Sequence, residues 1–248
     1  MDVIKKLSLK TYFSASVELT SGEHIQTNSF YPAFYGALYR QERLLKDKIK
    51  EIENFEFIPT DIDNDPEIPE HLKSYRKQHD TKENKLRDIY GDVLSDIRIS
   101  IIIFSCSLLE GVINEYLLLK SNSKSEFDKM EQNSFIKKWT EIPKQFASAY
   151  TLDSQLQSEL EELYSKRRKL LIHDKPTLKE NHIVKIQGKN IASAENETEL
   201  LFKLCELPEK LISNLFNYDL EVNTLGSKIW NFKSQCCHYI ETRKYYTK

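Results

Sequence analysis

Hydrophobic residues recur along most of this chain at the spacing of an α-helix. Over residues 82–120, apolar positions return every three or four residues, which predicts one long helix. Between 99 and 113 the apolar side chains spread around that helix, so we expect this half to be buried on most sides. Shorter amphipathic patterns predict four more helices, over 32–53, 126–139, 154–172 and 197–215. The pattern therefore predicts a mostly α fold.

Two segments depart from helical spacing. The first 30 residues are rich in Thr, Ser, Val and aromatic residues in partial alternation, which predicts a small β element at the N-terminus. Residues 182–191 alternate around a Gln-Gly-Lys-Asn turn, which predicts a small β-hairpin.

An acidic, proline-rich segment predicts the domain organisation. Residues 59–70 carry three prolines and almost no large apolar side chain, as in a linker. We therefore expect an N-terminal α/β extension over 1–58, a linker over 59–72 and a helical domain over 73–248. The core of that domain is expected at about 85–220.

Composition narrows the class of protein. The 36 basic and 38 acidic residues leave a net charge of -2, so no global basic field attracts nucleic acid, and any contact with RNA must be local. The four cysteines show no metal-binding spacing, and no glycine-rich phosphate loop occurs. The longest apolar stretch, 99–113, is shorter than the roughly 20 residues that span a bilayer. We expect a cytoplasmic protein without membrane association, metal or cofactor.

One segment carries residues suited to phosphodiester chemistry. Arg168 and His173 are separated by four residues at the predicted end of a helix, just before Asp-Lys-Pro. A guanidinium stabilises charge that develops on a phosphate, and an imidazole moves a proton near neutral pH. Spacing alone favours another interpretation, in which the basic residues from Lys166 to His173 offset the negative end of the helix dipole.

Three segments together resemble the HEPN superfamily (higher eukaryotes and prokaryotes nucleotide-binding). The run from Arg168 to His173, Arg-Lys-Leu-Leu-Ile-His, is similar to the family's R-x4-6-H motif. Residues 105–117 resemble the family's earlier core helix, and residues 135–146 resemble the short helix that lies between the two. The resemblance covers about 85–220 and implies a compact helical bundle.

The resemblance implies a metal-independent endoribonuclease that leaves a 2′,3′-cyclic phosphate and a 5′-hydroxyl. His173 would act as general acid or base, and Arg168 would stabilise the phosphorane. The family also implies a homodimer with two motifs facing one cleft, RNA as substrate, and the setting of a toxin or an antiphage-defence component with a cognate antitoxin or defence-system partner. The alternative is a non-catalytic module for dimerisation, protein interaction or nucleotide binding.

The motif departs from the family at two positions. Lys169 follows Arg168, where the family most often has Asn or Asp; if Arg167 is the motif arginine, Arg168 fills that place. Either arginine therefore fits. Lys175 replaces a tyrosine found in members paired with nucleotidyltransferase antitoxins, which disfavours that pairing.

Two polar residues in the long helix are candidates for a supporting role. Glu110 and Asn114 stand four apart and share one helical face within a strongly apolar segment. Because a lone buried carboxylate is costly, we expect Glu110 to bind and orient Arg167 or Arg168. The alternative places Glu110 at the bundle edge, in water.

Overall fold

The fold is mostly helical, as the hydrophobic pattern predicts. The computed structural model describes residues 13–29, 31–168 and 194–219. The hairpin predicted at 182–191 lies outside the described residues.

The predicted N-terminal β element is confirmed as a two-stranded antiparallel hairpin. Strand β1 (Phe13–Glu18) pairs with β2 (His24–Ser29) so that Phe13 faces Ser29. Gly22 in the turn has a φ of 82°, a left-handed conformation that costs glycine little. The Ser21 N–H donates to the Asn122 carbonyl (2.9 Å), which fastens the turn to the helical body.

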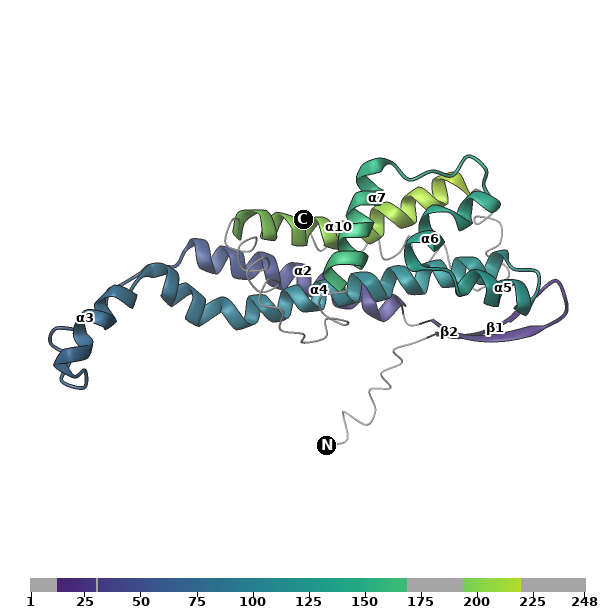
Figure 1. Ribbon diagram of the computed structural model, residues 1–248. Coiled ribbons are helices and arrows are strands. Elements are labelled where there is room, and N and C mark those ends of the chain that lie inside the picture. The colour runs from purple at the N-terminus through teal and green to yellow at the C-terminus, as the bar shows by residue number, and fades with distance from the viewer. Residues whose placement is uncertain (1–12, 30, 169–193, 220–248) are drawn as a thin grey trace, which may run out of the picture.

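Three long helices form the body. Helix α4 (Lys82–Lys120) runs along most of the molecule, and α2 (Tyr31–Glu53) and α10 (Ala194–Tyr218) pack against it (Figure 1). The bounds of α4 match the predicted range because the apolar spacing is sustained and Thr81 caps its first turn by accepting from the Asn84 N–H (3.3 Å).

The helix predicted at 126–139 is divided into short pieces. Ser123 and Ser134 each cap a new helix, because each hydroxyl accepts the N–H of the residue three positions later. The pieces are α5 (Lys124–Glu131) and α6 (Phe135–Thr140), and the 3-10 helix η1 (Ile142–Gln145) follows them.

The helix predicted at 154–172 changes its type. It begins as α7 (Ser154–Glu161) and continues as the π-helix η2 (Glu162–Arg168), and its remaining residues lie outside the described part of the chain. A further short helix, α3 (Glu70–His79), begins within the last residues of the predicted linker (59–72) and was not expected from the sequence. Pro208 lies inside α10 and does not end it.

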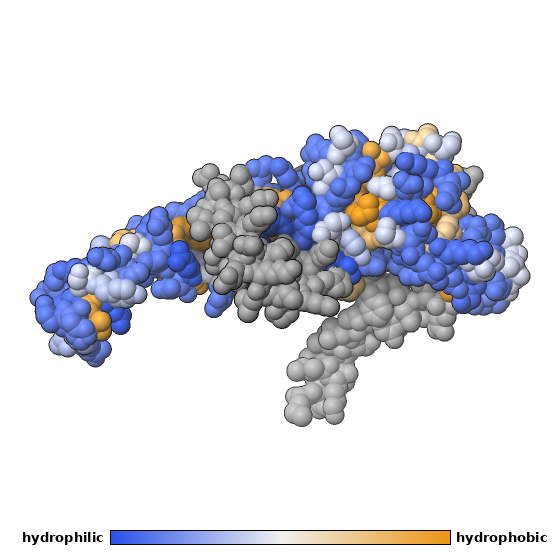
Figure 2. Space-filling view, in the orientation of Figure 1, coloured by the Kyte–Doolittle hydropathy of each residue, from blue (hydrophilic) through white to orange (hydrophobic). Residues whose placement is uncertain are grey.

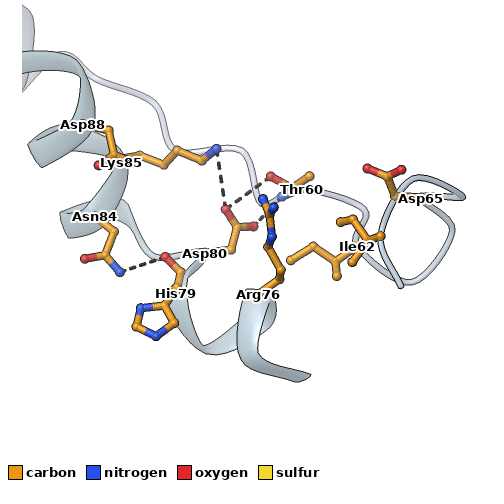
Figure 3. A pocket seen from close by; sticks show the side chains of 10 residues that line it. Thr60, Ile62, Asp65, Arg76, His79, Asp80, Asn84, Lys85 and Asp88 are labelled. Atoms are coloured by element: carbon orange, nitrogen blue, oxygen red, sulfur yellow. Dashed lines mark hydrogen bonds and ion pairs between the residues drawn. The ribbon is translucent and has the colours of Figure 1, made fainter. Parts of the chain in front are cut away.

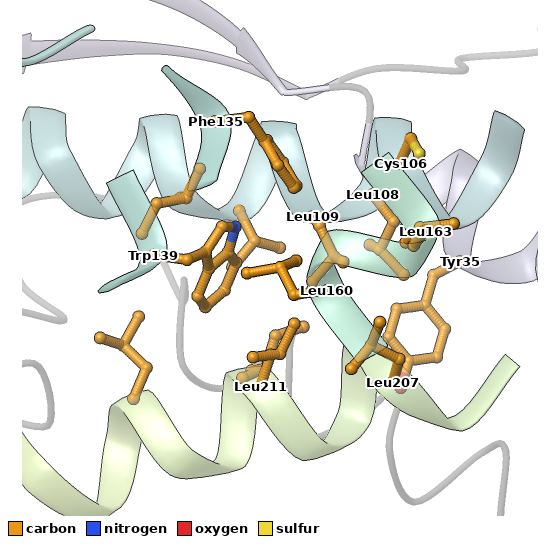
Figure 4. Close-up of a cluster of buried hydrophobic side chains, with 14 of the residues drawn as sticks. Tyr35, Cys106, Leu108, Leu109, Phe135, Trp139, Leu160, Leu163, Leu207 and Leu211 are labelled. Atoms are coloured by element: carbon orange, nitrogen blue, oxygen red, sulfur yellow. The ribbon is translucent and has the colours of Figure 1, made fainter. Parts of the chain in front are cut away.

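Among the described residues, one buried cluster joins the helices of the body. Trp139 of α6, Leu160 of α7 and Leu211 of α10 meet beside α4 (Figure 4). The apolar half of α4 is buried, as expected, although Ile99 and Ile103 stay 39% and 36% exposed, so one face of this half is partly open to solvent.

The same cluster includes side chains from both sides of the predicted linker. Tyr35 and Leu38 of α2 are 2% and 1% exposed and belong to the cluster that surrounds α4. The division into 1–58, 59–72 and 73–248 stays a prediction, but the described parts of the extension and the helical domain share one core. Most of the surface visible in Figure 2 is hydrophilic. None of the described helices has the length and apolar character of a membrane-crossing segment.

Candidate functional site

The π-helix η2 gives the two candidate arginines different surroundings. In a π-helix the backbone hydrogen bonds join residues five apart, so such residues lie on one side. The Arg167 Nε donates to Glu162 Oε1 (2.9 Å), and Lys166 pairs with the same carboxylate (2.7 Å). Burial raises the pKa of Glu162, but these two cations outweigh it and hold the pKa below its usual value. Arg167 is thus engaged by a carboxylate of its own helix.

Arg168 lies against an aromatic ring instead. Its guanidinium carbon stands 4.4 Å from the centroid of the Tyr164 ring, within the range of a cation–π interaction. The Tyr164 ring stacks in turn on Phe135 of α6, with centroids 4.1 Å apart and planes 11° from parallel. Phe135 is buried, so the stack is anchored in the core.

The face of α4 that carries Glu110 is near this stack. Burial raises the pKa of the Cys106 thiol to about 12, and the nearby charge of Glu110 raises it further while that of Arg168 opposes the shift. Burial and Glu110 likewise raise the pKa of Tyr164 against the effect of Arg168. Cys106 is therefore a neutral thiol near pH 7 and is unsuited to act as a nucleophile.

A buried lysine from α6 completes the polar face. Lys138 Nζ donates to Asn114 Oδ1 (2.9 Å) and lies 3.9 Å from the Glu131 carboxylate. Its side chain is 4% exposed, and burial lowers the pKa of Lys138 although Glu131 and Glu110 oppose the change.

The predicted contact between Glu110 and an arginine is wrong. No ion pair links Glu110 to Arg167 or Arg168 within the described ranges, because one guanidinium is bound by Glu162 and the other lies on Tyr164. Glu110 is half-buried rather than fully in water. Asn114 lies on the same face, as predicted, and is held by a lysine.

His173 lies outside the described residues, so the structure places Arg168 but not its predicted partner. Tyr164, Phe135 and Lys138 were not predicted as site residues. Tyr164 stands four residues before Arg168, a spacing that puts both on one helical side. Lys138 directly precedes Trp139 and stands three residues after Phe135, a spacing that places it on the apolar side of this short segment, close to the core.

A hollow unrelated to these residues lies at the α3 end of the molecule (Figure 1 and Figure 3). It has a volume of about 270 Å³ and is lined by the linker, α3 and the start of α4. Asp80 there accepts from the N–H (2.6 Å) and the hydroxyl (3.2 Å) of Thr60 and lies 3.9 Å from Lys85. These contacts fasten the linker to α4. In the described part of the chain, no three His, Cys, Asp or Glu side chains gather as a metal site would require.

Comparisons with protein-family models, with curated proteins and with solved structures find no match to this chain.

Proposed function

We propose that this protein is a metal-independent endoribonuclease of HEPN type. In the proposed reaction, a ribose 2′-hydroxyl attacks the adjacent phosphorus while His173 acts as general acid or base. The bond to the 5′-oxygen breaks, and the leaving oxygen takes a proton. The products are a 2′,3′-cyclic phosphate and a 5′-hydroxyl, and Arg168 stabilises the charge of the crowded phosphorane.

The surroundings of the two arginines are the observation that supports this proposal. Glu162 forms an ion pair with Arg167, whereas no described carboxylate lies within 4.0 Å of the Arg168 guanidinium. A guanidinium whose N–H groups are not bound to a carboxylate can bind a phosphate by two parallel hydrogen bonds. This difference favours Arg168 as the motif arginine.

The proposal includes a homodimer in which two Arg168–His173 pairs face one cleft. Such an arrangement concentrates positive charge locally, which a chain of net charge -2 needs in order to bind RNA. The proposed setting is cytoplasmic, as a toxin or antiphage-defence component with a cognate partner.

RNA cleavage by the purified full chain tests the proposal. Labelled RNA of mixed sequence is incubated with the protein and a chelator, and the fragment ends are analysed for the cyclic phosphate. We expect His173→Ala and Arg168→Ala each to slow cleavage by about 10²-fold or more. The matched controls are His71→Ala and Arg43→Ala, because both replaced residues are exposed on other helices.

Two results would overturn the proposal: RNA left intact by the unmodified protein, or cleavage that persists unchanged in His173→Ala. Nucleotide binding without turnover, measured by calorimetry, would instead support the non-catalytic module.

A further inference from the structure

We propose that Tyr164 is a positioning residue for Arg168, and that its ring, stacked on Phe135, holds the guanidinium ready for a phosphate. This inference rests on the proposed function, and it assigns a role to a residue outside the Arg–His motif.

The stack has a fixed base. Phe135 is 3% exposed and is the first residue of α6, directly after the Ser134 cap. The near-parallel contact between Phe135 and Tyr164, with centroids 4.1 Å apart, joins η2 to α6 at the level of Arg168. Movement of the Tyr164 ring would break an aromatic pair at the edge of the core, so the ring is a stable support.

The Arg168 guanidinium carbon lies 4.4 Å from the Tyr164 ring centroid, and no hydrogen bond joins this guanidinium to a described residue. A cation over a ring interacts through the face of the planar guanidinium, while the N–H groups point outward in its plane. Arg167 shows the contrasting case, because its Nε is bound by Glu162. A ring therefore restricts the orientation of the guanidinium and leaves its full positive charge for a ligand.

Glu110 makes this support important. Glu110 and Arg168 both act on the pKa values of Cys106 and Tyr164, so the carboxylate and the guanidinium lie in one small region. Opposite charges in a partly buried region attract strongly. Without the ring, Arg168 could turn toward Glu110 and form the ion pair that the sequence predicted, which would occupy the donors that a phosphate needs.

Two substitutions at one position separate positioning from general stability. Tyr164→Phe keeps the ring and loses only the hydroxyl, so we expect kcat for RNA cleavage within about twofold of the unmodified protein. Tyr164→Leu removes the ring, and we expect kcat to fall about 5- to 30-fold, the range of a cation–π contact, with a smaller change in KM. Tyr75→Leu is the matched control, since Tyr75 is an exposed tyrosine on α3.

A double-mutant cycle tests whether the effect passes through Arg168. In an Arg168→Ala background, Tyr164→Leu should cause no further loss of kcat, because the group that it positions is gone. Independent losses that multiply would overturn the inference, as would full activity of Tyr164→Leu.

A spectroscopic measurement keeps this inference distinct from the proposed function. The Nε–Hε signal of Arg168 should be shifted by the ring current in the unmodified protein and in Tyr164→Phe, and the shift should disappear in Tyr164→Leu. If the shift is present but the protein cleaves no RNA, the proposed function fails although the stack exists. If RNA is cleaved and the shift is absent, the positioning role fails alone.

Discussion

Replacing Lys138 by methionine is expected to stabilise the protein by about 1 kcal/mol at pH 7. The Lys138 side chain is 4% exposed and has one short hydrogen bond, to Asn114, and one long ion pair of 3.9 Å, to Glu131. Burying a cation with so little compensation costs free energy, and apolar replacement of poorly compensated buried charges commonly gains about 1–4 kcal/mol. Loss of the hydrogen bond to Asn114 reduces that gain by about 1 kcal/mol.

The direction of the pKa shift gives this prediction a second signature. Burial lowers the pKa of Lys138 in the folded state, so between the lowered and the ordinary pKa the unfolded chain binds more protons than the folded one. The free energy of unfolding of the unmodified protein therefore rises with pH across that alkaline window through this group. Methionine does not titrate. The advantage of Lys138→Met should be largest below the window and shrink as the pH approaches the ordinary pKa of lysine.

Urea denaturation at pH 7 and at pH 10 measures both signatures. Lys137→Met is the matched control, because Lys137 is the exposed neighbour on the same helix and its replacement should change stability by less than about 0.5 kcal/mol. Loss of stability in Lys138→Met at pH 7, or a gain that is the same at both pH values, would refute the reasoning.

Two further predictions concern buried groups of α4. Cys106 should not react with a thiol reagent in the folded protein at pH 8, because its side chain is 3% exposed and burial raises its pKa to about 12. Cys106→Ala should therefore leave the number of fast-reacting thiols unchanged. A count lower by one thiol would contradict this prediction. Leu109→Ala should lower the free energy of unfolding by about 2–5 kcal/mol, since Leu109 is 0% exposed in the centre of the core. Urea denaturation measures this loss, with Ile89→Ala, at an exposed position of the same helix, as the control. Equal losses in the two variants would contradict the prediction.

Sustained periodicity is the part of the fold that sequence patterns predict well. Helix α4 was predicted with its observed bounds, because a 39-residue pattern is much longer than its uncertain ends. The division of 126–139 was missed because it depends on a single hydroxyl group: α5 ends at Glu131, and Ser134 caps the start of α6. An apolar pattern averaged over several turns does not register such a local cap.

The candidate site was predicted in part, for the same kind of reason. The shared face of Glu110 and Asn114 follows from their spacing. The partners on that face come from other helices, and no spacing rule predicts that Lys138 donates a hydrogen bond to Asn114. The π-helical geometry of η2 depends on the pattern of backbone hydrogen bonds, which the side chains of 162–168 do not reveal.

Helix α4 joins two regions of very different packing. Within residues 54–96, all of which the structure describes, Ile62 alone is buried, and the first buried residue of α4 is Ile97. Local opening costs little free energy where few apolar contacts are lost, and much more inside a core. The backbone amides of α4 should therefore exchange with solvent quickly in the first turns and slowly beyond Ile97. One unbroken helix thus contains two levels of protection against hydrogen exchange. A protease should cut within residues 54–96 while the three-helix body stays folded.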